Sequence, residues 1–455
     1  MYLLPILTLV AIYWQYQKKN NGVFGPVSYL ISAYLIMALS FFILHFSGLF
    51  KSVFDYKIEP MVYLSFSFLI VFWGFVNYRD EKINAISIEN NFVYNVLEKL
   101  IMVGGFMAIL FFSRFAIDHF LSGDIENERL NVGDFATKTL GSFGLLNSFL
   151  SLFSNFFTLA ILFGFINLIR KKKRSAYLLF ISSTSYIVYV FAYVGRDGFV
   201  YWTMTFLFFY FLFRKFLNSD TRKKLIRSFS IAIIIALIPF LLITAARFSG
   251  DSPNVIMNMF SYGGQQIINF NDRYQVDAQI TYGRGSFPIF IDALENIGFQ
   301  IPNPKIDDIN AIYLDADIKP WTFGTYISSF NMNFGKLGTI VLLVILSSIS
   351  RKLINKNVER GRFSLSDLIL FTLLFQFVLW GVFYFRFYSA NFYILGVIII
   401  YLILKISVNE KILVLKSLVN FNSKIKYGFR YRWFQYSRRG RFNPFKGTSL
   451  QFRKN

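Results

Sequence analysis

The sequence contains no cysteine, which excludes disulfides, thiol catalysis and cysteine-ligated iron–sulfur clusters. It has only two histidines, His45 and His119, which lie in different segments and predict neither a histidine-rich metal site nor an HEXXH motif. A phosphate-binding P-loop and the GxSxG elbow of serine hydrolases are absent as well. We therefore expect no metal, no cofactor, no ATP-driven transport and no hydrolase triad.

Charged residues are also scarce. They make up 16% of the 455 residues, against about 25% in soluble proteins, whereas 55% of the residues are hydrophobic and 20% are aromatic. Because apolar runs recur along the chain, we predict one membrane domain over residues 1–407 and a basic cytoplasmic tail over residues 408–455. The first apolar run lacks a preceding basic flank and a following cleavage site, which predicts a retained helix and not a signal peptide.

Eleven apolar runs predict membrane-spanning helices. A bilayer core of about 30 Å needs about 20 mostly apolar residues, and lipid offers no hydrogen-bond partner to a backbone that is not helical. The sequence therefore predicts an all-α, polytopic fold. The runs centre on residues 2–16, 24–46, 60–77, 98–117, 145–168, 176–194, 199–217, 229–246, 337–350, 364–385 and 392–407.

The basic residues predict the orientation of these runs. They gather over residues 170–174, 214–227 and 351–362 and in the tail after residue 406, and two apolar runs separate each cluster from the next. All four clusters therefore lie on one side, which the positive-inside rule assigns to the cytoplasm. The N-terminus is then outside and the C-terminus inside. The net charge of +22 reflects this topology, so we expect no nucleic-acid partner.

The opposite side carries a long loop over residues 247–321. Ordered loops of this size are commonly functional. Within it Phe290, Ile291, Leu294 and Ile297 recur at helical spacing with polar residues between them. This spacing predicts a short helix, which either lies flat at the membrane surface or packs against the membrane domain.

Arginines on this outer side are the main candidates for function, because a guanidinium binds phosphate through two parallel charge-assisted hydrogen bonds. Arg196 and Asp197 lie in the turn Gly195–Gly198, and Arg284 lies between two glycines of the long loop. Glycine lets the backbone approach a ligand, although a purely structural turn is the alternative in both places. A second group of candidates comprises Arg247, Arg273 and Arg386.

Three features resemble the Wzy-type O-antigen and capsule polymerases, also called oligosaccharide repeat unit polymerases. One is the number of spans with a dominant late outer loop, and another is the Gly195–Gly198 turn that opens a span. The third is Trp321-Thr322-Phe323-Gly324-Thr325-Tyr326 followed by Asn333-Phe334-Gly335-Lys336-Leu337-Gly338. It is similar to a family pattern with an aromatic–Thr stretch and then Asp-Phe-Gly-x-x-Gly, in which Asn333 stands where the family usually has Asp. The Arg-x10-Gly spacing of some related polymerases and ligases is not met by Arg273 or Arg284.

The resemblance implies an inverting, metal-independent glycosyltransferase of the GT-C type in the bacterial cytoplasmic (inner) membrane. It would join undecaprenyl-pyrophosphate-linked oligosaccharide repeat units into O-antigen or capsular polysaccharide at the outer face. Its partners would be the donor and acceptor lipid-linked glycans, membrane lipids and a co-polymerase that regulates chain length.

The resemblance also suggests roles for the candidate residues. Arg196 and Arg284 would bind the pyrophosphate, and Asp197 or Asp277 would act as general base. Further substrate contacts would come from two groups: the arginines Arg247, Arg273 and Arg386, and the aromatic residues Tyr282, Trp321 and Tyr326. For these aromatic residues the alternative to stacking on sugars is packing in the core or at the membrane interface.

Two other functions remain open from the sequence. An O-antigen ligase shares the architecture, but its long loop usually contains a functional histidine, and the loop here has none. A lipid-linked oligosaccharide flippase usually shows two similar helical halves and short loops, which this chain lacks.

Overall fold

The computed structural model describes residues 1–48, 50–121, 140–248, 255–319, 322–385, 391–407 and 413–416. The side chains of residues 120, 245–248, 255–260, 306 and 413–416 lie outside this description. Each of the eleven apolar runs is helical. The helices are α1 (Leu4–Lys19), α2 (Pro26–Ser47), α3 (Ile58–Trp73), α4 (Asn91–Leu121), α7 (Gly144–Asn155) with α8 (Phe157–Ile169), α9 (Lys173–Ser183) with α10 (Ser185–Ala192), α11 (Asp197–Phe213), α12 (Ser219–Phe248), α16 (Thr325–Arg360), α17 (Leu365–Trp380) and α18 (Asn391–Ile406).

Many of these helices have the length and composition of membrane spans. Within the described residues five helices are long and apolar enough to cross a membrane, and the bent pair α7–α8 makes a sixth if it is one span. The five are α2, α4, the pair α9–α10, α12 and α16, and α3, α17 and α18 are shorter apolar helices. The chain is thus a mostly helical membrane protein.

Helix breaks lie within or next to some of the predicted spans. α7 and α8 meet at an angle of 44°, and Phe156 between them leaves the helical conformation. The Phe156 ring lies against Gly396 of α18, where an added Cβ would come within 2.8 Å of it. α16 is broken at Gly335, whose φ of 70° is left-handed, and this break coincides with the start of the predicted run at residue 337.

The prediction of an all-α fold is wrong in one respect, because the structure contains a small mixed sheet. β1 (Ala85–Ile88) pairs in parallel with β2 (Arg362–Ser364) and antiparallel with β3 (Leu413–Lys416). Strands of three or four residues carry almost no alternating pattern, so the sequence gives no sign of them. Glu89 ties the sheet to the bundle by accepting hydrogen bonds from the backbone N–H groups of Leu365 and Ser366, each at 3.0 Å.

The long predicted loop is largely helical. It contains α13 (Val255–Gln275), α14 (Pro288–Asn296) and α15 (Ile306–Asp315). α14 confirms the helix predicted around residues 290–297. On it Ile291 is buried, whereas Leu294 and Ile297 remain exposed.

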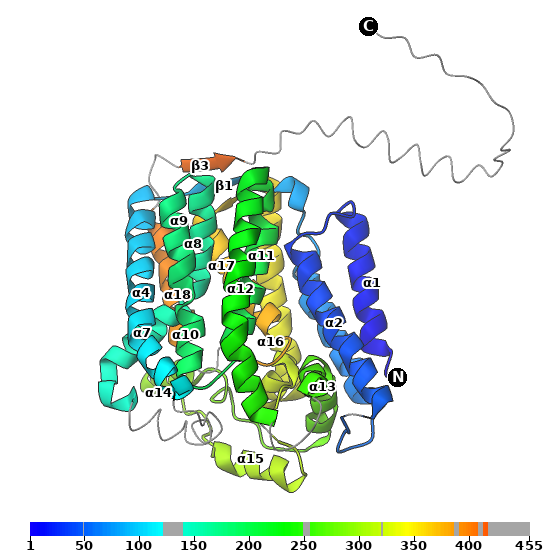
Figure 1. The fold of residues 1–455 in the computed structure, drawn as a ribbon. Helices are drawn as coiled ribbons and strands as arrows, with labels where there is room; N and C mark the ends of the chain where they lie inside the picture. Colours follow the sequence, from blue (N-terminus) through cyan, green and yellow to red (C-terminus); the bar gives the residue numbers. More distant parts are fainter. Residues whose placement is uncertain are drawn as a thin grey trace, which may run out of the picture.

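The two ends of the bundle differ in charge. The sheet lies at one end, and α13, α14, α15 and the N-terminus lie at the other (Figure 1). The basic clusters belong to the sheet end: Arg170 donates to Asn91 at the start of α4 (2.8 Å), and Lys215 lies 3.4 Å from Asp80 in the 3₁₀ helix Asp80–Lys82 that precedes β1. Two further 3₁₀ helices span Gly141–Phe143 and Arg214–Phe216.

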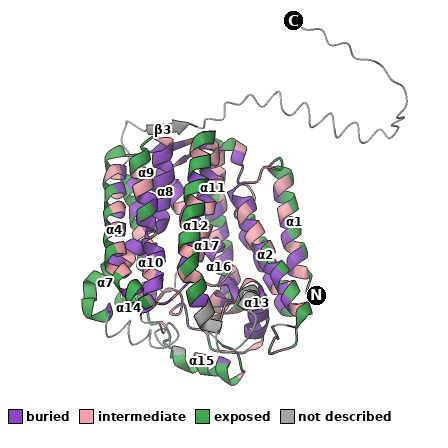
Figure 2. Ribbon diagram, viewed as in Figure 1, coloured by how far each residue is buried: buried purple, intermediate pink, exposed green. Residues whose placement is uncertain are grey.

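Burial divides the helices into central and peripheral ones (Figure 2). All but the last residue of α8 is buried, and every residue of α17 except Leu370 is buried, so these apolar helices form the centre of the bundle. α12 is the opposite case: only 11% of its most apolar stretch is buried, against 33–61% in the other four long spans.

Candidate functional site

A cavity of about 980 Å³ lies at the end of the bundle opposite the sheet. Its walls come from α11, α12, α13, α15 and α16, from the turn after Thr281, and from the segments around residues 323 and 384. Among the described residues, the charged side chains in the wall are Arg196, Asp197 and Arg273. The other polar and aromatic lining residues include Gln265, Asn310, Asn333, Phe240, Tyr262, Phe323 and Tyr384.

Arg196 is held among aromatic rings in this wall. Its side chain is 8% exposed, and its Nη1 donates to the Thr244 hydroxyl on α12 at 2.8 Å. The guanidinium lies 4.4 Å from the centre of the Tyr262 ring and 6.0 Å from that of Phe240, both within cation–π distance. α11 begins at the next residue, so the positive end of its dipole adds to the charge of Arg196. Asp197 lies in the first turn of the same helix, so this part of the cavity presents both a guanidinium and a carboxylate.

The glycines of the predicted turn are needed for space. An added Cβ on Gly195 would lie 2.7 Å from Val190 Cγ1, and one on Gly198 would lie 2.7 Å from Val190 Cβ. Because α10 and α11 approach this closely, Arg196 and Asp197 enter the cavity at a fixed position. The Tyr384 hydroxyl donates to Asp197 Oδ2 at 3.0 Å and orients the carboxylate.

Arg273 also lines the cavity, and it organises the backbone beside it. Its Nη2 donates to the carbonyl oxygens of Lys319 and Thr322 and to the Thr322 hydroxyl. Gly324 lets the Arg273 side chain come close, since an added Cβ would lie 2.6 Å from Arg273 Nη1. Burial lowers the pKa of Arg273 to about 10, so its guanidinium is still protonated at neutral pH.

The break in α16 shapes another wall. The N–H groups of Thr281 and Gly283 donate to the carbonyl oxygens of Met332 and Asn333, at 3.0 Å and 3.2 Å. The Thr281 hydroxyl donates to Asn333 Oδ1 at 2.6 Å. These hydrogen bonds hold the loop that contains Thr281 and Gly283 against α16. The side-chain partner in α16 is the uncharged amide of Asn333.

Arg284 itself does not line the cavity. Its guanidinium makes a bidentate pair with Glu295 of α14 and donates to the carbonyl oxygens of Ile301 and Pro302. The structure thus separates the two arginines predicted as pyrophosphate ligands: Arg196 faces the cavity, whereas Arg284 fastens α14 to its loop. This arrangement favours the structural alternative for Arg284.

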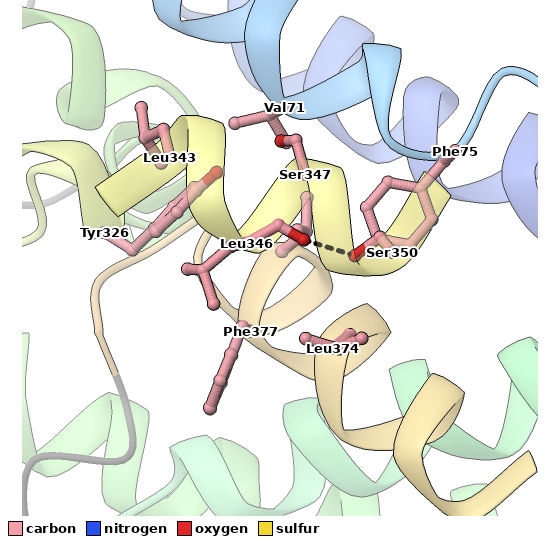
Figure 3. A pocket seen from close by; sticks show the side chains of 10 residues that line it. Val71, Phe75, Tyr326, Leu343, Leu346, Ser347, Ser350, Leu374 and Phe377 are labelled. Carbon is pink, nitrogen blue, oxygen red and sulfur yellow. Dashed lines mark hydrogen bonds between the residues drawn. The ribbon is translucent and has the colours of Figure 1, made fainter. Parts of the chain in front are cut away.

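The other predicted residues are placed as follows. Tyr282 and Asp277 are exposed outside the cavity lining, which leaves Asp197 as the better-placed general base. Tyr326 is 1% exposed and lines a separate void of about 10 Å³ between α3, α16 and α17 (Figure 3). That void has room for no more than a water molecule, so Tyr326 packs in the core. Trp321, Arg386 and the side chain of Arg247 lie outside the described residues.

Several lining residues were not predicted from the sequence, among them Tyr262, Gln265, Asn310 and Tyr384. A signal for α13 does exist in the sequence, where Gly263 and Gly264 are followed by a series of amide side chains. Gly264 is explained by close packing on α2, because an added Cβ would lie 2.4 Å from the backbone nitrogen of Phe41. Nothing in the sequence brings Tyr384 to Asp197.

The arrangement combines a buried cation, a carboxylate, aromatic rings and neutral amides in one cavity. Guanidinium suits a phosphate, and aromatic faces and amides suit sugar rings and hydroxyls. Among the described residues no group of three or more His, Cys, Asp or Glu side chains could hold a metal ion. Comparisons of the chain with protein-family models, with curated proteins and with solved structures find no match.

Proposed function

We propose that the chain is a membrane glycosyltransferase that polymerises undecaprenyl-pyrophosphate-linked oligosaccharide repeat units. The observation that carries the proposal is Arg196, a buried guanidinium that faces a large cavity at the end of the bundle opposite the basic clusters. A lipid pyrophosphate is an anion located at the membrane surface, and this position suits it. Aromatic rings and amides in the same cavity suit the attached sugars.

The proposed reaction uses two groups in the wall of the cavity. An acceptor hydroxyl attacks the anomeric carbon of the donor sugar while the bond from that carbon to the pyrophosphate oxygen breaks, which inverts the configuration. Asp197 takes the proton from the acceptor hydroxyl. Arg196 stabilises the negative charge that develops on the leaving pyrophosphate.

The proposed topology has eleven spans with the N-terminus outside and the basic sheet end in the cytoplasm of a bacterium. It is supported by the helical state of all eleven apolar runs. The separation of basic clusters from the cavity also supports it, because positively charged ends stay in the cytoplasm. The cavity then opens on the outer side, where the glycans are.

Lipid-linked glycan analysis in a null strain tests the function. A polymerase predicts single repeat units at the cell surface, restored to long chains by the intact gene but not by the Arg196→Ala variant. The matched control is Arg114→Ala, which removes an exposed arginine of α4 outside the cavity lining and should restore long chains. Repeat units trapped in the cytoplasm would instead identify a flippase, and unattached long chains a ligase.

A further inference from the structure

α12 is attached to the bundle in an unusual way. In its described part only Leu225, near one end, and Ile243 and Thr244, near the other, are buried. No residue over positions 226–242 is buried, a length of about 25 Å at 1.5 Å per residue. A helix that crosses most of a bilayer core without a buried residue leaves apolar surface open on its inward face as well as on its outward face.

The inward face of α12 is apolar and half-buried. It is formed by Phe229, Ala232, Ile233, Ala236 and Phe240, which contact the core but stay partly open. We call these five residues the α12 strip. Ala232 and Ala236 at its centre carry small side chains.

The two ends of the α12 strip differ. At the end near the sheet the Phe229 ring stacks on Phe206 of α11, with ring centres 4.2 Å apart, and this stack closes the strip. At the other end Phe240 lines the cavity beside Arg196. Pro239, which removes a helical hydrogen bond, lies directly before Phe240. The Phe240 ring also contacts Phe199 of α11, with ring centres 5.5 Å apart. The strip therefore runs along α11 from the Phe229 stack to the cavity beside Arg196.

From this geometry we infer that the α12 strip holds the polyprenyl chain of the lipid-linked substrate. The inference rests on the proposed function, because that function supplies the pyrophosphate at Arg196. A pyrophosphate held there would leave its hydrocarbon chain beside Phe240, and the strip continues from that point for about 16 Å into the membrane. Its apolar lining suits a chain without polar groups. The hydrogen bond between Arg196 and Thr244 would keep α12 in place over the bound lipid.

Photocrosslinking of the full-length protein in lipid nanodiscs tests the inference. A benzophenone amino acid is placed at Ala236, in the strip, or at the adjacent Ile235, which is 65% exposed on the outward face at the same depth. The probe is radiolabelled undecaprenyl pyrophosphate. We expect at least fivefold more labelling at position 236 than at 235, competed by unlabelled probe, and less labelling at 236 in the Arg196→Ala background. A second pair, Ile233 against Ile234, repeats the comparison in case the Ala236 variant does not fold.

The outcomes separate the two proposals. Equal labelling on the inward and outward faces, or labelling that unlabelled probe does not compete, would overturn the α12 strip as a polyprenyl site, even if the protein makes polymer. Labelling that is confined to the inward face and is reduced by unlabelled probe would support the α12 strip as a polyprenyl site. If the null-strain glycans then indicated a flippase or a ligase, only the polymerase proposal would fail.

Discussion

The role of Arg196 can be tested by a graded series of substitutions. Arg196→Ala removes the cation, Arg196→Lys keeps the charge without the planar fork, and Thr244→Val leaves the guanidinium but removes its hydroxyl partner. Removing a donor that stabilises a developing anion typically costs about 10²–10³-fold in kcat. We expect this loss for alanine, and a loss of at least about tenfold for lysine, which cannot make two parallel hydrogen bonds.

The contacts of Arg196 give an estimate of how much stability each substitution removes. Arg196→Ala removes the hydrogen bond to Thr244, worth about 1 kcal/mol, and ring contacts worth about 0.5–2 kcal/mol. It also removes a buried charge, so the protein should still fold. Thr244→Val removes the same hydrogen bond and should therefore lower thermal stability to a similar extent. Its effect on turnover should stay within about tenfold, because the cation remains.

The assay is the rate of polymer formation from purified lipid-linked repeat units by the protein in nanodiscs, with melting temperature measured on the same samples. A loss of turnover that follows stability across the series, with Thr244→Val as impaired as Arg196→Ala, would show that Arg196 acts through folding alone. Normal turnover of well-folded Arg196→Ala would refute its assignment as the pyrophosphate ligand.

Three further predictions concern the frame around the cavity. Gly198→Ala should lower stability by about 1–3 kcal/mol through overlap with Val190, and Val190→Ala in the same chain should restore part of the melting temperature. Replacing Arg284 or Glu295 should lower the melting temperature, and the double variant should be little worse than either single one; additive effects would contradict the ion pair. Arg273→Met should lower stability by about 1–3 kcal/mol through lost hydrogen bonds. That difference should stay constant from pH 6 to pH 9, because burial lowers the pKa of Arg273 to about 10 in the folded protein, below its value in the unfolded chain. Above pH 10 the folded guanidinium loses its proton first, so the intact protein should gain stability relative to the variant; a change below pH 9 would contradict this sign.

The resemblance to repeat-unit polymerases remains a prediction, but the structure gives its motifs physical roles. Gly324 makes room for Arg273, and Gly335 breaks α16 so that the loop at Thr281 can dock. Asn333 performs its docking role as a neutral amide. These contacts build the cavity wall and require no charge at position 333.

Hydropathy and charge in the sequence determined the helical membrane character, the limits of the apolar runs and the segregation of basic residues to one end. Those properties are local, because a span needs only its own apolar length and its own backbone hydrogen bonds. The short sheet was not predicted, because its strands gain stability only from partners far away in the chain.

Which arginine faces the cavity was decided by tertiary structure alone. Arg196 and Arg284 look alike in sequence, because each lies beside glycines. Packing against Val190 directs Arg196 to the cavity, whereas Glu295 on α14 holds Arg284 outside its lining. The partners that make this difference come from other elements. Local sequence does not specify which element will lie opposite a given side chain.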